Sequence, residues 1–113
     1  MKWVSESLNY AEYNKYVLVD FALSKETEKA IRIKIDRSVL RLFSTIYDKF
    51  YKSIRIEGIC IWIPKSCVRN YTDKKAFINL YILRSNVTKE SVKHIQDKFG
   101  LNKEEILDVK LSQ

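Results

Sequence analysis

Histidine and cysteine, which often supply nucleophiles and metal ligands, are scarce in this chain. His94 is the single histidine, which excludes HExxH zinc sites and the paired-histidine site of rolling-circle nucleases. Cys60 and Cys67 form no CxxC pair, and nothing in their spacing couples either thiol to His94 as nucleophile and base. Cys60 lies in an apolar run and is predicted to be a core residue, which we favour over a Cys60–Cys67 disulfide. No P-loop, GxGxxG or GxSxG motif is present, so we expect no cofactor, metal or small-molecule substrate.

One short pattern has the form of a metal-dependent nuclease site. Asp108 and Lys110 are two residues apart on a predicted strand, and Asp20, Glu57 or Asp97 would supply a second carboxylate. Clustered carboxylates hold Mg²⁺, and a nearby lysine positions the attacking water. A solvated strand face produces the same pattern, so we predict a protein that is not an enzyme and keep a nuclease as the alternative.

The clearest functional signal is an excess of positive charge. The 21 Lys and Arg residues outnumber the 14 Asp and Glu residues, which gives a formal net charge of +7. Such a surplus attracts polyanions such as nucleic acid. An anionic membrane face is less favoured, because neither predicted helix combines a strongly basic face with a Trp-rich apolar face. The charge is spread over predicted elements and is not gathered in a tail.

The composition predicts a single intracellular domain spanning residues 1–113. Hydrophobic residues are 46% of the chain and charged residues 31%, which is enough to bury a core and remain in solution. The longest apolar run, Ile59–Ile63, is far shorter than the roughly 20 residues that span a bilayer. The first residues lack the apolar run of a signal peptide. We expect a cytoplasmic or host-cell protein, neither secreted nor membrane-bound, whose abundant Ile and Lys are typical of AT-rich archaeal or viral genomes.

The first half of the chain is predicted to form a hairpin followed by a helix. Apolar residues alternate with others along Lys15–Leu23 and Glu28–Ile35, and the polar Ser24–Thr27 between them predicts a turn. Apolar residues then recur at three- and four-residue intervals along Arg37–Lys52, which predicts an amphipathic helix. Residues 1–14 have weak periodicity and are expected to form an arm or a poorly ordered terminus.

The second half is predicted to contain two strands, a helix and one further element. Pro64 ends an Ile-rich strand, Thr88 is predicted to cap the helix, and Gly100 suits its left-handed end. The predicted elements are a strand at Ile54–Ile63, a polar connection at Lys65–Asp73, a strand at Lys75–Arg84, a helix at Thr88–Phe99, and a final strand or turn of helix at Glu104–Ser112.

This order of elements predicts an α+β fold. The last six elements follow the β-α-β-β-α-β order of the ferredoxin-like arrangement, in which an antiparallel sheet carries two helices on one face. Lys15–Leu23 would add an extra N-terminal strand at the edge of that sheet. If Glu104–Ser112 is helical, the order is ββαββα instead.

The sheet face opposite the helices is expected to carry cations and aromatic rings. Arg32 and Lys34 would project from one strand, and Phe77 and Tyr81 from another. Cations that follow phosphates and rings that stack on bases are combined in single-strand binding surfaces. The alternative places Phe77 and Tyr81 in the core or in a dimer interface.

Two short segments resemble known nucleic-acid-binding families. Lys75–Asn79 resembles the start of the RNP1 segment of RNA-recognition motifs, with Asn79 where a second aromatic is expected. Ile63–Arg69, with the Ile-rich strand before it and Phe77–Leu83 after it, resembles the swapped-hairpin DNA-binding segment of AbrB-type regulators. Asp73-Lys74 replaces the usual Gly-Asp turn of that family. The second resemblance implies a DNA-binding dimer, with Lys65 and Arg69 on a loop near the DNA.

We predict a small, homodimeric nucleic-acid-binding protein that acts mainly through phosphate contacts. The predicted binding residues are Arg32, Lys34, Lys65, Arg69, Lys74, Lys75, Phe77 and Tyr81. The main alternative is a protein–protein interaction module, such as a viral accessory or assembly component, whose charge only supports solubility. The two hypotheses differ in whether the protein binds nucleic acid at low salt.

Overall fold

The computed structural model describes residues 3–36 and 58–100, and this part of the chain is mixed α+β. A short helix and three strands precede residues 37–57, and three strands, a short helix and a long helix follow them. In chain order the elements are η1 (Tyr10–Lys15), β1 (Tyr16–Asp20), β2 (Ala22–Glu26), β3 (Ala30–Asp36), β4 (Gly58–Pro64), η2 (Lys65–Cys67), β5 (Val68–Arg69), β6 (Lys75–Asn79) and α3 (Leu80–Phe99).

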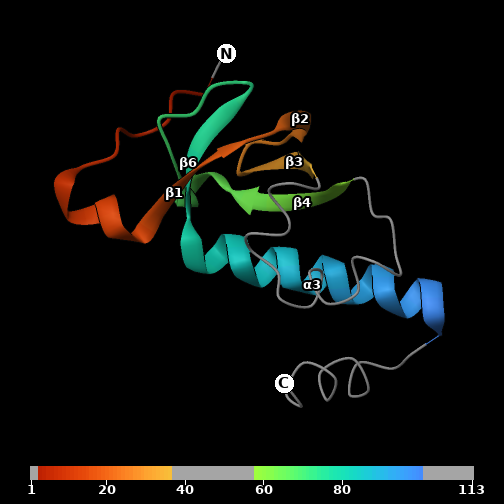
Figure 1. The fold of residues 1–113 in the computed structure, drawn as a ribbon. Helices are drawn as coiled ribbons and strands as arrows, with labels where there is room; N and C mark the ends of the chain where they lie inside the picture. The colour runs from red at the N-terminus through yellow and green to blue at the C-terminus, as the bar shows by residue number, and fades with distance from the viewer. Residues whose placement is uncertain (1–2, 37–57, 101–113) are drawn as a thin grey trace.

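Two antiparallel sheets share two bent segments of chain. Sheet A has the strand order β1-β6-β5, and sheet B has the order β2-β3-β4. β1 continues into β2 after Phe21, and β4 continues into β5 through η2. The Phe21 N–H donates to the Lys74 carbonyl at 2.8 Å, which extends the β1–β6 pairing up to the bend. Each of these two continuous segments therefore contributes one strand to sheet A and one strand to sheet B (Figure 1).

The core is built mainly from isoleucine and valine. Alternate residues of β3 and β4 are buried, because successive side chains of a strand project to opposite faces. β-Branched side chains suit such strands, since they pack well on a pleated surface. α3 lies beside β4 and adds Leu83 and Val87 to this core (Figure 1). The fully buried large side chains are Ile31, Ile33, Ile35, Ile61, Ile63, Ile78 and Leu83.

α3 begins directly where β6 ends. Asn79 is its N-cap, and the Asn79 Oδ1 accepts a hydrogen bond from the Ile82 N–H at 3.1 Å. The predicted start at Thr88 is therefore wrong, and so is the extension of the preceding strand to Arg84. The predicted end is confirmed: Gly100 has a φ of 67° and its N–H donates to the Gln96 carbonyl.

The first hairpin forms between β2 and β3, but its turn comes later than predicted. β2 continues through Glu26, and the Thr27 Oγ1 and N–H contact Ala30 to close the turn. β1, the earlier half of the predicted strand, pairs with β6 instead. The predicted polar connection also contains η2 and β5, with Val68 fully buried.

The α+β class is confirmed, but the described strands form two sheets where the ferredoxin-like order predicts one. Bends at Phe21 and η2 divide the long segments between the two sheets, and alternation alone gives no sign of such bends. The helix predicted at Arg37–Lys52 and the element predicted at Glu104–Ser112 lie outside the described residues.

Candidate nucleic-acid interface

The outer face of sheet B carries cations and an exposed tryptophan. Lys25 of β2 lies opposite Arg32 of β3, and Arg32 lies opposite Trp62 of β4. Directly opposed residues project to the same face, so these three side chains form a row across the sheet. Lys34 lies two residues farther along β3 on the same face, opposite Cys60. We call Lys25, Arg32, Lys34 and Trp62 the basic face.

The buried inner side of the same strands fixes these side chains outward. The residues that alternate with the basic face along β3 and β4 are buried isoleucines, which occupy the inner face completely: Ile31, Ile33, Ile35, Ile59, Ile61 and Ile63. A register shift between Leu23 and Lys25 places Lys25, rather than Ser24, opposite Arg32. The local irregularity of β2 thus brings Lys25, the third cation of the basic face, into the row with Arg32 and Trp62.

Contacts on the basic face leave its charges open to solvent. The Arg32 Nη1 donates to the Ser24 Oγ at 3.0 Å, which is a neutral partner and does not compensate the charge. Lys34 is exposed and its side chain passes close to Gly58, where a Cβ would lie 3.3 Å from the Lys34 Cε. Asp36, at the end of β3, places a carboxylate on the same strand face. Among the described residues, this face therefore carries the cations Lys25, Arg32 and Lys34 and the carboxylate of Asp36.

Trp62 is held at its backbone and exposed at its ring. The Trp62 carbonyl accepts a hydrogen bond from the Asn86 Nδ2 of α3 at 2.9 Å, while 44% of the residue is exposed. Cys60, its neighbour on the same face, is half-buried with a free thiol, so its predicted place in the core is wrong. Cys67 is also free.

Lys65 is enclosed by partners. The Lys65 Nζ lies 2.7 Å from the Glu26 Oε2 and 4.9 Å from the centre of the Trp3 ring, and its side chain is 10% exposed. Tyr71 packs against Trp3 with ring centroids 4.7 Å apart, and burial raises the pKa of the Tyr71 hydroxyl. The charge of Lys65 is thus compensated within the fold.

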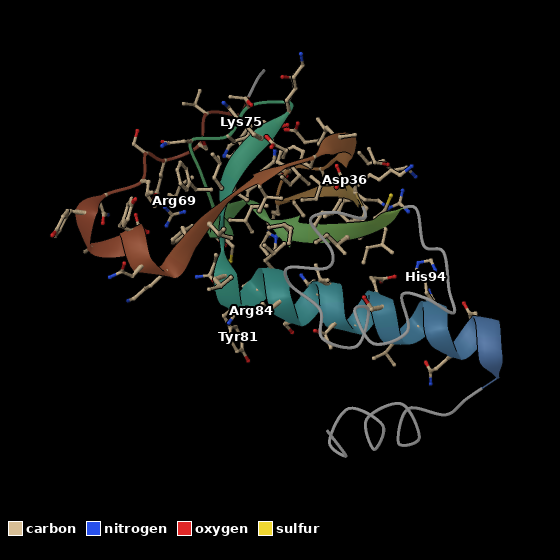
Figure 2. All side chains as sticks on the ribbon, viewed as in Figure 1. Asp36, Arg69, Lys75, Tyr81, Arg84 and His94 are labelled. Atoms are coloured by element: carbon tan, nitrogen blue, oxygen red, sulfur yellow. The ribbon has the colours of Figure 1, made fainter. Side chains whose placement is uncertain are left out.

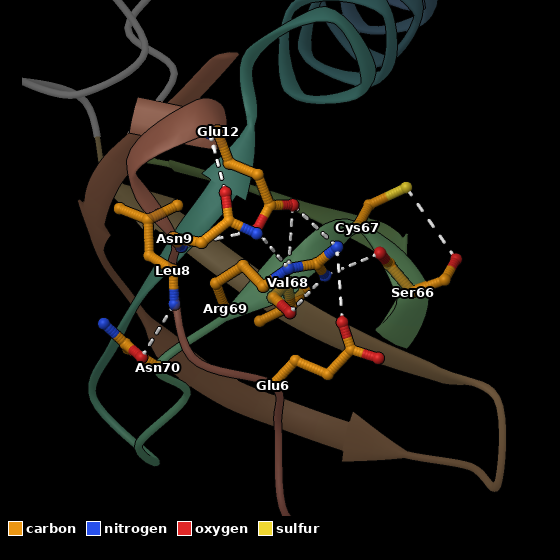
Figure 3. A network of polar contacts seen from close by, with 9 residues as sticks. All are labelled: Glu6, Leu8, Asn9, Glu12, Ser66, Cys67, Val68, Arg69 and Asn70. Atoms are coloured by element: carbon orange, nitrogen blue, oxygen red, sulfur yellow. Dashed lines mark hydrogen bonds and ion pairs between the residues drawn. The ribbon is translucent and has the colours of Figure 1, made fainter. Parts of the chain in front are cut away.

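Arg69 is the centre of a polar network that joins β5 to the N-terminal segment (Figure 3). Its guanidinium contacts Glu12 and Glu6, with Nη2 3.0 Å from Glu12 Oε2 and 3.6 Å from Glu6 Oε2. Its Nη1 donates to the carbonyls of Ser66 and Val68, at 2.8 and 3.0 Å. With a side chain 13% exposed and two carboxylates beside it, Arg69 stabilises the fold more directly than it attracts a ligand.

The predicted residues on and before β6 lie apart from the basic face, on sheet A. Lys75 lies opposite Asp20, and Lys74 is the last residue of the connection between β5 and β6. Both lysines are exposed. Phe77 is half-buried at the centre of sheet A, between Leu18 of β1 and Arg69 of β5.

The prediction that Phe77 and Tyr81 share one strand face is wrong. Tyr81 belongs to the first turn of α3 and is 79% exposed. In Figure 2, Lys75 lies at the upper end of sheet A, whereas Tyr81 lies beyond its lower end beside Arg84. Of the eight predicted residues, the structure brings Arg32 and Lys34 together on the outer face of sheet B.

Sequence reasoning missed Lys25 and Trp62 as members of this face. Lys25 fell within the predicted turn. Trp62 lies in the predicted Ile-rich strand and is not among the predicted binding residues, yet its alternation with Ile61 and Ile63 on β4 is a usable signal of an open outer face.

Several other expectations concern sites away from the basic face. His94 is exposed on α3. Within residues 3–36 and 58–100, no three His, Cys, Asp or Glu side chains gather as a metal site would require. The nuclease alternative depends on Asp108 and Lys110, which lie outside that part of the chain, as does Glu57, one of the three candidates for a second carboxylate. None of the helices described has the length and apolar character of a transmembrane span.

Comparison with protein-family models, with curated proteins and with solved structures gave no match to this chain.

Proposed function

We propose that this protein binds nucleic acid through phosphate contacts made by the basic face, without catalysing a reaction. The observation that carries the proposal is the row formed by Lys25, Arg32 and Trp62, with Lys34 beside it on β3. Neighbouring strands are about 5 Å apart, so the row spans roughly 10 Å. Cations this close together reinforce one another's attraction for a polyanion.

The other predicted cations contribute unequally in this proposal. Lys65 and Arg69 have ion-pair partners, so binding a phosphate would require breaking contacts to Glu26 or Glu12. Lys74 and Lys75 are exposed and remain candidates for phosphates that flank the central site. The basic face is therefore the part of the surface whose loss should weaken binding most.

The test is a fluorescence anisotropy titration of labelled oligonucleotides at two salt concentrations. The variant R32Q/K34Q removes two charges from the basic face. The control K15Q/R84Q removes two charges from exposed residues of η1 and α3, which are not part of the β2-β3-β4 sheet. R32Q/K34Q should weaken low-salt binding at least tenfold and reduce the slope of log K against log salt by about 1.4 to 1.8.

The control separates a localised site from general charge attraction. K15Q/R84Q should change affinity by less than about threefold. An equal loss in both double variants would mean that only net charge matters. No binding of any single- or double-stranded DNA or RNA at low salt would end the proposal.

A second candidate function is contact with another copy of this chain through the face of sheet A that carries Leu18 and Phe77. Leu18 is 51% exposed there and lies opposite the half-buried Phe77, so the face offers apolar surface in a fixed position. Sedimentation equilibrium should then find a dimer that Leu18→Ser converts to a monomer. A monomeric wild-type protein at micromolar concentration would contradict this second candidate.

A further inference from the structure

We propose that the nucleic acid bound by the basic face is single-stranded, and that one unpaired base stacks on the indole ring of Trp62. This inference rests on the proposed function and specifies the ligand of the same site.

The position of Trp62 is the first argument. A tryptophan with 44% of its surface exposed leaves a large apolar ring in water, whereas its neighbours Ile61 and Ile63 are buried. The inner face of β4 is filled by isoleucine, so the ring has no place in the core. The backbone beneath it is anchored by the Asn86 amide and by the pairing with β3. The ring is thus displayed from a rigid strand rather than from a loop.

The surroundings of the ring are the second argument. Cys60 and Pro64, two residues to either side on β4, are the neighbours of Trp62 on this face, and both are small. Arg32 is the directly opposed residue, but its guanidinium is bound to Ser24 on the far strand, β2. In the part of the chain that the structure describes, no second ring and no cation is stacked on Trp62. With 44% of Trp62 exposed and no stacked neighbour among the described residues, the indole is accessible to a ligand, and Arg32 and Lys34 lie on the same face of the sheet.

The combination of an open ring with adjacent cations favours a single strand. A base can stack on a side chain only when it is free of its own stack, as in single strands, loops and ends. Stacking tolerates every base, because each has a π-face. In a duplex the paired bases are not accessible to the ring, and Trp62 adds nothing to the phosphate contacts. The expected ligand is thus a single strand bound with little sequence preference.

The test compares variants of Trp62 on matched ligands. Trp62→Leu keeps an apolar side chain but removes the stacking ring, and Trp62→Phe retains a ring. The probes are a short oligothymidylate and a fully paired, blunt-ended DNA duplex with the same number of phosphates. Trp62→Leu should weaken binding of the oligothymidylate about fivefold or more, with an unchanged salt slope. Trp62→Phe should restore most of that loss, and neither change should alter binding of the duplex.

Tryptophan fluorescence of the unaltered protein gives a second measurement. Trp3 and Trp62 are the two tryptophans, and Trp3 is packed against Tyr71. Titration with oligothymidylate should quench the wild-type emission, whereas the Trp62→Phe protein, which reports Trp3 alone, should show little change. This result does not depend on whether Trp62→Leu folds.

The outcomes distinguish this inference from the proposed function. If oligothymidylate binds Trp62→Leu as tightly as the wild type, or leaves Trp62 unquenched, single-strand stacking is overturned. If R32Q/K34Q still weakens binding in that case, the phosphate-binding proposal stands. Tighter binding of the duplex than of the single strand would also overturn the inference.

Discussion

The carboxylate of Glu12 binds the guanidinium of Arg69 across 57 residues of sequence. Arg69 Nε donates to Glu12 Oε2 at 3.1 Å, and Nη2 lies 3.0 Å from the same oxygen (Figure 3). Around this pair, the Asn70 N–H donates to the Glu6 carbonyl at 3.0 Å, and the Tyr71 N–H to the Ser5 Oγ at 2.7 Å. The contact therefore joins the segment before β1 to the edge of β5 that faces away from β6, where Glu6 forms a β-bridge with Arg69.

Loss of the Glu12 charge should weaken this junction in a pH-dependent manner. The hydrogen bonds from Arg69 lower the pKa of the Glu12 carboxyl below its ordinary value of 4.5. A carboxyl with a lowered pKa in the folded state contributes stability above its unfolded pKa, and that contribution is lost as pH falls through the folded pKa. Glu12→Gln should therefore lower the urea midpoint at pH 7, and the difference from wild type should disappear well below pH 4.5.

The matched control for this experiment is Glu28→Gln, in the exposed turn between β2 and β3. It removes the same charge from a basic protein without touching Arg69. A Glu12→Gln deficit no larger than that of Glu28→Gln, or one that persists at low pH, would contradict the assigned role of the pair.

Replacing the cap of α3 should destabilise the protein. Asn79→Ala removes the acceptor of the Ile82 N–H, and such a loss costs about 1 kcal/mol. Asn79→Asp retains an oxygen at that place and should recover most of the stability. Chemical denaturation measures the free energy of unfolding, and equal values for the two variants would show that the cap is unimportant.

Replacing a buried hydroxyl should have the opposite effect. Ser91 lies on α3 with no exposed surface, and its Oγ has no hydrogen-bond partner among the described residues. A buried polar atom without a partner is unfavourable, so Ser91→Ala should raise the free energy of unfolding by about 1 kcal/mol. A clear loss of stability in Ser91→Ala would indicate that the hydroxyl has a stabilising partner after all.

A side chain at Gly58 should disturb the start of β4. A Cβ there would lie 2.8 Å from the Ile35 carbonyl oxygen, which is backbone and cannot move cheaply, and 3.3 Å from Lys34 Cε. Gly58→Ala should lower the free energy of unfolding by about 1 to 3 kcal/mol, as overpacking does. Thermal unfolding measures this, and an unchanged midpoint would contradict the close approach of β3 and β4 at this residue.

Alternation made parts of the fold predictable from sequence. The isoleucines of β3 and β4 have a strict period of two, so the strands and the outward direction of Arg32 and Lys34 follow from the pattern. The start of α3 did not follow, because Leu80, Ile82 and the residues before them fit a strand as well as a helix. In the structure the helix begins at Leu80, with Asn79 as its N-cap.

The remaining features depend on partners far away in sequence. Lys65 binds Glu26, 39 residues earlier, and Arg69 binds Glu12, 57 residues earlier, so neither ion pair leaves a local trace in the sequence. The same limit applies to Trp62, whose exposure depends on how the segments around sheet B are arranged. Local patterns predict which way a side chain points, but not whether another part of the chain covers it.

Mapping a bound oligonucleotide by NMR tests the central claim most directly. Amide and indole chemical shifts of the ¹⁵N-labelled protein are recorded during titration with oligothymidylate at low salt. The account predicts that the largest changes occur on β2, β3 and β4, at Lys25, Arg32 and Lys34 and at the indole N–H of Trp62. Changes centred on η1 and the first turn of α3, or no saturable changes at all, would contradict it.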